Sequence, residues 1–272
     1  MSAPTIDLST RPRPNRGLLD LTVLGIELRR VLRNRRTMIF MVVFPPVMFL
    51  FISAQITGKD DVMGPGIIAN VGAYVMVSMA LYGAVLATTS AGASVSIERA
   101  SGWSRQLRLT PLNPVAYIAM KMISALVLGA IATGVTFIVA SATGHAHMAA
   151  RSWVECALII LVGALVFAAF GLFMGYLLPS DNAMQFIGPV LAILSIFGGI
   201  FTGPISTDSL YGKIAEMTPI YGFSAIAHWP TTLTTSGTYG TFKFSWVVNL
   251  VVWAALFVAG AVWRFRKDTA RV

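Results

Sequence analysis

Long apolar stretches alternate with short polar segments along the chain. A bilayer core about 30 Å thick takes roughly 20 helical residues to cross, so each stretch of that length predicts a membrane-spanning helix. Six stretches qualify: residues 37–56, 67–91, 115–143, 153–178, 184–203 and 245–263. None holds an acidic or basic residue near its middle, and Lys121 and Glu155 lie close enough to span ends for their charges to reach water. The pattern predicts an all-α membrane protein with six transmembrane helices.

A different periodicity precedes the first span. Apolar residues recur there every three or four positions, namely Leu18, Leu21, Leu24, Leu28 and Val31. The charged residues Glu27, Arg30 and Arg33 fall away from that stripe. This spacing predicts an amphipathic helix over residues 18–36 that lies flat in the membrane interface. An ordinary polar lead-in to the first span is the alternative interpretation.

The remaining segments complete the predicted organisation. Residues 1–17 contain three prolines and no apolar periodicity, so we expect a disordered tail. The amphipathic helix follows, then a six-helix domain over residues 37–263 and a short tail over residues 264–272. In the first span, Pro45 and Pro46 remove backbone donors, so we expect a kink there.

Polar and aromatic residues form one line along the second span. Tyr74, Ser78 and Tyr82 follow Asn70 at every fourth position. Lipid does not favour hydroxyl groups, so this face should point into protein or a cavity. Adhesion between helices and a lining for a substrate pathway are both open interpretations.

Two later spans carry their own stripes. Gly163, Phe167, Gly171 and Gly175 line one face of the fourth span, and this spacing predicts close helix packing. The fifth span carries an apolar face of Phe186, Val190, Ile193, Phe197 and Phe201. Packing in the core is the default interpretation of that face, and the wall of an apolar pocket is the alternative.

Two loops stand out by their composition. Residues 94–114 mix charged residues with Trp103 and a break at Gly102, which predicts a short surface helix. Residues 204–244 form the longest loop, and its middle, residues 210–229, is too apolar for a free loop. We expect one or two short helices there that dip back into the outer leaflet.

Composition and charge set the orientation. Hydrophobic residues make up 56% and charged residues 11% of the chain, whereas soluble domains carry about 25% charged residues. By this prediction, 16 of the 20 basic residues lie on one side of the membrane. They belong to the N-terminal segment, the loop after the second span with the start of the third span, and the C-terminal tail. The positive-inside rule then places both termini in the cytoplasm, with the protein in the plasma membrane. This distribution explains the net charge of +9 without nucleic acid.

Signatures of chemistry are missing from the sequence. We find no phosphate-binding glycine loop followed by Lys-Ser or Lys-Thr, and the single Cys156 excludes an internal disulfide and a multi-thiol metal site. His145 and His147 are interpreted as residues of a solvated loop. No carboxylate lies deep in a span to relay protons. We therefore expect no catalytic residue, metal or cofactor in this chain.

Four segments carry a resemblance to a known family. They are the basic run 29–36 before a span with Pro45, the stretch IERASGWSRQLRLTP at residues 97–111, the LPS motif at 178–180 leading to FGGIF at 197–201, and Ile214-Ala215 before Pro219 and Tyr221. In these features the sequence resembles the membrane subunits of ABC-2-type exporters, and among them the drug- and antibiotic-export permeases. The resemblance covers nearly the whole chain, and the second segment is the most specific.

The resemblance implies a type-2 ABC exporter permease fold and a mechanism. Two permease chains, identical or paralogous, would form the pathway, and two ATP-binding subunits that hold ATP and Mg would dock beneath them. This chain would not itself be an enzyme. The implied ATPase-coupling residues are Glu98, Arg99, Gly102, Trp103, Arg105, Gln106 and Arg108, with the interfacial residues Leu21, Leu28, Arg30 and Arg33. Glu98 and Arg105 are expected to face that partner.

The expected function is export of a hydrophobic drug-, antibiotic- or lipid-like substrate by alternating access. The candidate pathway residues are Tyr74, Ser78, Tyr82, Phe186, Phe197 and Phe201. Alternatives are a permease for polysaccharide or teichoic acid, a membrane enzyme, and a non-transporting resistance or sensor subunit. The partners expected are the ATP-binding subunit, a second permease chain and membrane lipids.

Overall fold

The computed structural model describes residues 21–33, 35–58, 60–102, 114–178, 180–205 and 208–269. Within these ranges the chain is mostly α-helical. Its β-structure there is limited to two isolated β-bridges. The tail predicted over residues 1–17 lies outside them, as do Trp103, Arg105, Gln106 and Arg108.

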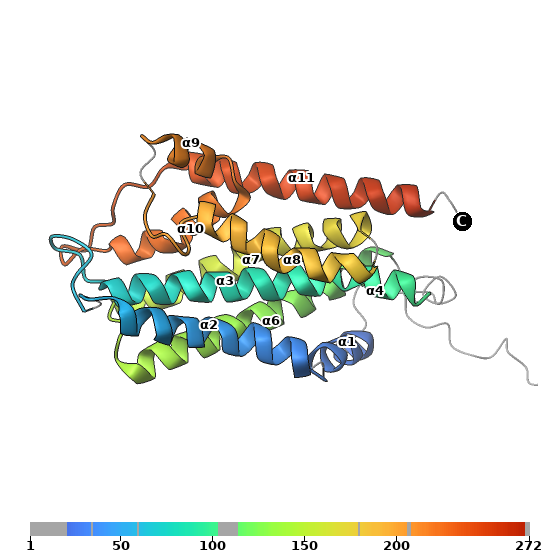
Figure 1. Cartoon of the computed structure of the whole chain (residues 1–272), viewed down its shortest axis with the longest axis horizontal. Helices are drawn as coiled ribbons and strands as arrows, with labels where there is room; N and C mark the ends of the chain where they lie inside the picture. Colours follow the sequence, from blue (N-terminus) through green and yellow to red (C-terminus); the bar gives the residue numbers. More distant parts are fainter. Residues whose placement is uncertain are drawn as a thin grey trace, which may run out of the picture.

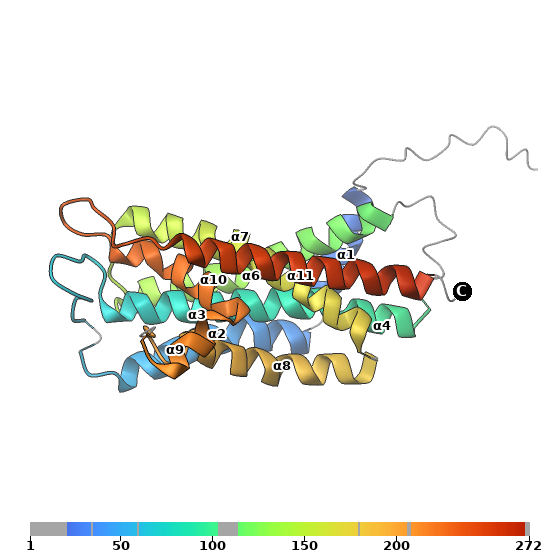
Figure 2. The ribbon, with the colours of Figure 1, turned by 90° about the horizontal axis from the view of Figure 1, so that it is seen from above.

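Six long helices run side by side and form the body of the molecule (Figure 1, Figure 2). They are α2 (Arg35–Gln55), α3 (Val71–Ala93), α6 (Pro114–Thr143), α7 (Ala150–Leu177), α8 (Ser180–Phe197) and α11 (Phe244–Thr269). At one end lie the short helices α1 (Leu21–Arg33) and α4 (Val95–Ala100). Toward the other end lie α9 (Leu210–Glu216), α10 (Pro219–His228) and the 3₁₀ turn η2 (Trp229–Thr232).

The helices confirm an integral, multi-pass membrane protein. Five described segments are long and apolar enough to cross a bilayer: Met38–Gln55, Val71–Ala100, Tyr117–Thr143, Ala150–Leu177 and Phe244–Phe265. The predicted fifth span corresponds to α8, whose apolar part Gln185–Phe197 is shorter. The prediction that this span continues to Gly203 is wrong, because the helix ends at Phe197 and the chain turns through Gly199 and Gly203, both at positive φ.

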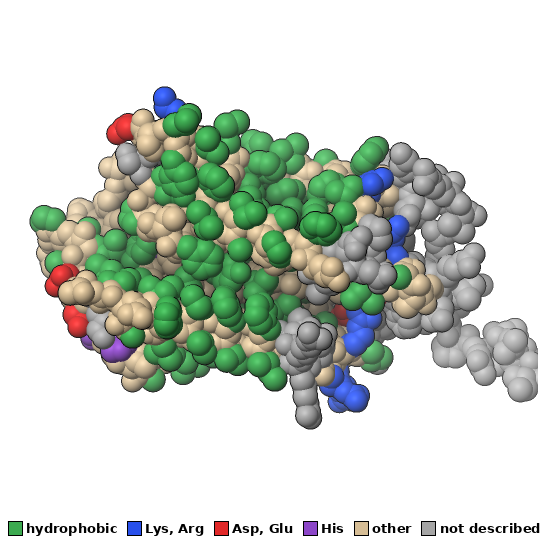
Figure 3. Space-filling model, in the orientation of Figure 1, with side chains coloured by type: hydrophobic (Ala, Val, Ile, Leu, Met, Phe, Trp, Pro, Cys, Tyr) green, Lys and Arg blue, Asp and Glu red, His purple; other side chains and the backbone are tan. Residues whose placement is uncertain are grey.

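Charge separates the two ends of the bundle. Lysine and arginine side chains gather around α1, α4 and the C-terminal end of α11, and an apolar belt covers the middle (Figure 3). Acidic and histidine side chains appear at the opposite end. We call the first the basic end and the second the distal end.

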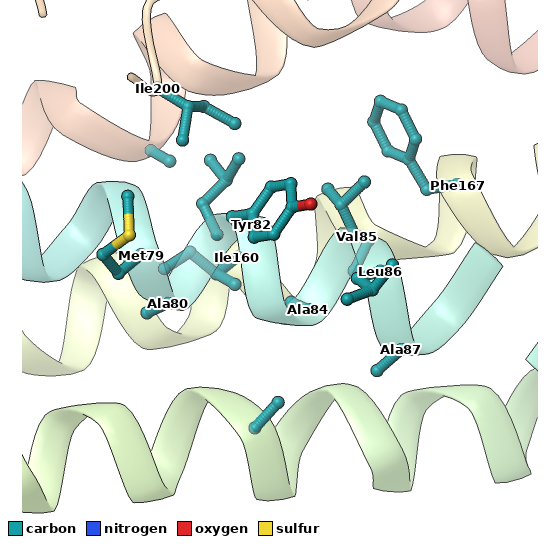
Figure 4. Close-up of a cluster of buried hydrophobic side chains, with 14 of the residues drawn as sticks. Met79, Ala80, Tyr82, Ala84, Val85, Leu86, Ala87, Ile160, Phe167 and Ile200 are labelled. Carbon is teal, nitrogen blue, oxygen red and sulfur yellow. The ribbon is translucent and has the colours of Figure 1, made fainter. Parts of the chain in front are cut away.

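Helix α3 forms the axis of the fold. Every residue from Gly72 to Ala93 except Tyr74 is buried. Ala80, Ala84 and Ala87 face α6, while Tyr82 lies on the side of Ile200 (Figure 4). The predicted polar line of the second span therefore faces protein.

Glycines bring α3 and α7 into backbone contact. A Cβ atom at Gly171 would lie 2.0 Å from the carbonyl oxygen of Thr89, and one at Gly92 would lie 2.4 Å from the carbonyl oxygen of Ala168. At Gly163 a Cβ would lie 2.1 Å from the ring of Phe223 on α10. The packing interpretation of the fourth-span stripe is confirmed.

The long loop before α11 folds as two short helices, as the sequence predicted. Asp208 is followed by Ser209, whose hydroxyl accepts a hydrogen bond from Gly212 N and caps α9. Pro219 begins α10, where a missing backbone donor costs nothing. Helix α10 is largely buried, and its Phe223 stacks on Phe167 with ring centroids 5.8 Å apart. The loop thus returns into the bundle.

Candidate functional site

Ionised side chains join three helices at the basic end. The carboxylate of Glu98 on α4 accepts from Arg30 Nη2 on α1 and from Lys121 Nζ and the Tyr117 hydroxyl on α6. Glu27 on α1 accepts from the same Lys121 Nζ, and from Arg30 Nη2 at 3.3 Å. We call Glu27, Arg30, Glu98, Tyr117 and Lys121 the ion cluster.

The ion cluster is balanced and largely withdrawn from water. The side chains of Lys121 and Glu98 are 3% and 5% exposed, and that of Arg30 is 45% exposed. Two acids face two bases, so the formal charges cancel. Burying ions is costly unless their partners compensate; the cluster therefore favours one arrangement of α1, α4 and α6.

Arg99 attaches the opposite side of α4 to α7. Its Nη1 donates to the carbonyl oxygens of Gly175 and Tyr176, both at 3.3 Å, and its guanidinium lies 5.4 Å from the Tyr176 ring centroid. These carbonyls belong to the last turn of α7, where a cation is favourable. Helix α4 is thus attached to α1 and α6 through Glu98 and to α7 through Arg99.

The predicted coupling residues are placed differently from what the sequence suggested. Gly102 has φ +74° just after α4, which confirms the predicted break. The expectation that Glu98 faces a partner is wrong, because its carboxylate is buried in the ion cluster. The expectation that Lys121 extends to water is wrong for the same reason. Burying either charge alone would be costly, so the two pair.

Helix α1 (Leu21–Arg33) lies within the segment predicted as an amphipathic helix over residues 18–36, and α2 begins at Arg35. Side chains of α1 also contact other helices. Arg30 reaches Glu98, Arg33 is exposed, Leu28 is half-buried, and the side chain of Leu21 lies outside the described part. Sequence reasoning missed Glu27 and Tyr117. The available signal was Lys121 itself, because a lysine inside an apolar segment requires an acidic neighbour.

A buried histidine joins α10 to α3 nearer the distal end. His228 Nδ1 lies 2.8 Å from the carbonyl oxygen of Ser224, and Nε2 lies 3.0 Å from the Ser78 hydroxyl and 3.3 Å from the Tyr74 carbonyl oxygen. The Tyr74 ring stacks on the imidazole with centroids 4.0 Å apart. In the neutral tautomer in which Nδ1 donates to the nearer carbonyl, that of Ser224, Nε2 accepts from the Ser78 hydroxyl. This contact was not predicted, because His228 lies 150 residues from Ser78.

Acidification should weaken this contact. Burial lowers the pKa of His228 from 6.5 to about 4. Because the folded ring binds its proton less well than the unfolded one, the stabilisation is complete above pH 6.5 and is lost as the pH falls toward 4. The loss amounts to about 3 kcal/mol. Thermal unfolding of the purified chain between pH 7 and 4 should show this slope in the wild type and in His145→Gln but not in His228→Gln; equal slopes in all three would refute it.

The candidate pathway residues meet at one point only among those described. The rings of Tyr82 and Phe201 lie 5.0 Å apart, while Phe197 stacks on Tyr211 at 5.5 Å. Ser78 joins α3 to α10 through its contact with His228, in agreement with the interpretation of this line as adhesion between helices. Phe186 is exposed, as is Ile193, so core packing is wrong for these two positions. That face of α8 is available to lipid or to a second chain.

Two cavities adjoin these contacts. The basic-end cavity, about 340 Å³, lies between α1, α2, α3, α4 and α6 and is bordered by Arg30 and Glu98. The distal cavity, about 250 Å³, has aromatic walls from Tyr74, Tyr221, Trp229 and Trp246, and His228 also borders it. Drug-sized pockets are about 300–1,000 Å³, so the basic-end cavity lies at the lower end of that range and the distal cavity lies below it. Each suits a small molecule or part of a larger one.

Comparisons with known proteins agree with this architecture. Residues 21–270 match the family model of the ABC-2 family transporter proteins. The chain is also similar to a protein of Bacillus subtilis (strain 168) named Putative transport permease YvfS. The two are 24% identical over 201 residues, which cover 73% of this chain and 80% of the relative.

Proposed function

The chain belongs to the ABC-2 family of transporter proteins, and we propose that it is the membrane-spanning permease subunit of an ATP-driven exporter. The observation that carries the proposal is the family match, which includes α1, the bundle and α11. ATP and Mg bind to a separate ATP-binding subunit, present in two copies, and this chain is not the enzyme. A second permease chain, identical or paralogous, completes the pathway.

The attachments of α4 support a route for coupling. The ATP-binding subunits dock at the basic end and push on α4 and the residues that follow it. Since the ion cluster attaches α4 to α6 and Arg99 attaches it to α7, a displacement of α4 moves both spans together. This motion alternates the pathway between inward-open and outward-open states. Glu98 and Arg99 act through these internal contacts, and Trp103, Arg105, Gln106 and Arg108 are the candidates for direct contact with the partner.

The character of the cavities supports a hydrophobic substrate, drug-, antibiotic- or lipid-like. Four aromatic residues border the distal cavity, together with small apolar and hydroxyl-bearing residues. No lysine, arginine or acidic residue among those described borders it. Exposed apolar residues on α2 and α8, such as Phe40, Val47 and Phe186, suit lipid or the second permease chain.

Substitution of Trp103 tests the coupling proposal. Buried tryptophans are typical anchors of interfaces, so Trp103→Ala should weaken binding of the ATP-binding subunit about thirtyfold and lower substrate-stimulated hydrolysis. Trp103→Phe keeps an aromatic anchor and should restore most of the affinity. The thermal midpoint of the isolated chain should be unchanged in both variants. Wild-type affinity in Trp103→Ala would refute the contact. Glu98→Lys is unsuitable for this test, because Glu98 is buried.

Cysteine labelling tests the orientation. The single native cysteine, Cys156, is buried and should not react with the label. Ser101 at the basic end and Thr238 at the distal end are both exposed. With the basic end in the cytoplasm of the plasma membrane, an impermeant maleimide should label Thr238→Cys in intact cells and Ser101→Cys only after permeabilisation. External labelling of Ser101→Cys would reverse the proposed orientation.

A further inference from the structure

The basic-end cavity has two chemically different parts. Its walls are apolar and come from several helices: Val31 of α1, Met38 and Met41 of α2, Ala91 of α3 and Leu128 of α6. Its polar border is formed by Arg30 and Glu98 of the ion cluster and by the serines Ser90, Ser94 and Ser101. Met38 is the first residue of the first apolar span, so the cavity lies at the depth where headgroups meet acyl chains. A ligand there must have an apolar part and a polar part.

The charge around this cavity favours an anionic group. The oxygens of Glu98 already accept from Arg30, Lys121 and Tyr117, so the carboxylate is occupied. Arg30 is half-exposed and also borders an adjoining hollow of about 670 Å³ on α1. Arg29 and Arg33 border the same hollow, and neither forms a salt bridge within the described residues. The polar side therefore carries surplus positive charge (Figure 3).

We propose that the basic-end cavity and its adjoining hollow together bind an amphiphile with a phosphate or carboxylate head, whose apolar chain packs against Met38, Met41 and Leu128 while its head faces Arg29, Arg30 and Arg33. Arginine is well suited to both acids, since its fork donates two parallel hydrogen bonds. The cavity volume of about 340 Å³ accommodates one acyl chain or ring system, so the second chain of a two-chain lipid would remain in the bilayer. Because Arg30 and Glu98 border the cavity and also join α1 to α4, occupancy stabilises that contact. Binding does not depend on the proposed export function.

Native mass spectrometry of the purified full-length chain tests the site. The chain is reconstituted in nanodiscs that contain equal amounts of dioleoylphosphatidylglycerol and dioleoylphosphatidylcholine, and bound molecules are counted after release. One phosphatidylglycerol per chain should be retained in preference to phosphatidylcholine. In nanodiscs of phosphatidylcholine alone, added oleate should occupy the site. Retention from the bilayer identifies a membrane lipid as the occupant, whereas retention of oleate alone identifies a diffusible amphiphile, and both support the proposed chemistry. Equal retention of the two phospholipids, with no bound oleate, overturns it.

Matched variants separate this site from general attraction to the membrane. Ala91→Phe fills the cavity, whereas Ala130→Phe makes the same change on an exposed position of α6. Arg33→Gln removes one head contact, whereas Lys213→Gln removes a charge from the distal end. Retention of phosphatidylglycerol should fall about fivefold in Arg33→Gln and be lost in Ala91→Phe, with both controls at the wild-type level. If Ala91→Phe does not fold, Arg33→Gln still tests the site, because Arg33 is exposed and its substitution should leave the fold intact. Wild-type retention in Arg33→Gln refutes the site.

Discussion

Replacing Glu98 with alanine should destabilise the folded chain by about 3 kcal/mol. Lys121 and Arg30 would lose a shared acceptor, the Tyr117 hydroxyl would lose its partner, and the buried cluster would keep a net positive charge. Glu27 remains beside Lys121, which places the cost at the low end for breaking a buried ion pair. Thermal or denaturant unfolding of the purified chain in one detergent measures the change.

Glu155 provides the matched control for this substitution. It pairs with Arg151 at 2.6 Å and accepts from the Tyr239 hydroxyl, but the Arg151 side chain is 67% exposed. Exposed pairs contribute about 1 kcal/mol or less, so Glu155→Ala should change stability far less than Glu98→Ala.

A double variant tests whether charge balance is the cause. In Glu98→Leu with Lys121→Met, Glu27 and Arg30 remain as a neutral pair, so most of the lost stability should return. Failure to recover would show that shape rather than charge holds α4 in place. Equal effects of Glu98→Ala and Glu155→Ala would contradict the buried cluster itself.

The sequence predicted the helices well because hydropathy is a local signal. Segment length and composition located the spans, and the apolar periodicity of residues 18–36 located α1. The spacing of Gly163, Gly171 and Gly175 indicated close packing, because small residues have few other reasons to recur on one helix face. Gly102 likewise indicated the end of α4.

The site could be predicted only in part because its contacts are long-range. Glu98 was identified as important for the wrong reason: the positive-inside count describes the loop as a whole and does not resolve which way one carboxylate points. Its partner Lys121 is 23 residues away, and Glu27 is 94 residues from Lys121. His228 and Ser78 are farther apart still. No single-sequence periodicity relates positions on different helices, so such pairs appear only after the helices pack.

Replacing Gly171 with valine should disrupt the bundle at the backbone contact between α3 and α7. The Cβ atom would lie 2.0 Å from the carbonyl oxygen of Thr89 and 2.8 Å from the Thr89 carbonyl carbon, both backbone atoms in the C-terminal part of α3. Side chains can change rotamer to relieve such a clash, but a buried helix backbone cannot, so α3 and α7 must separate. We expect a loss of about 3 kcal/mol, the upper end for overpacking, and a low yield of folded protein.

Gly134 of α6 provides the matched control for this prediction. It also lies within a membrane-spanning helix, but a Cβ atom placed there has no neighbour within 4 Å. Gly134→Val therefore carries the same change in helix propensity and volume without the clash, and it should unfold at the wild-type temperature. Gly171→Ala should already be impaired, because its single methyl group meets the same carbonyl. If Gly171→Val and Gly134→Val unfold alike, α3 and α7 are not in backbone contact at Gly171.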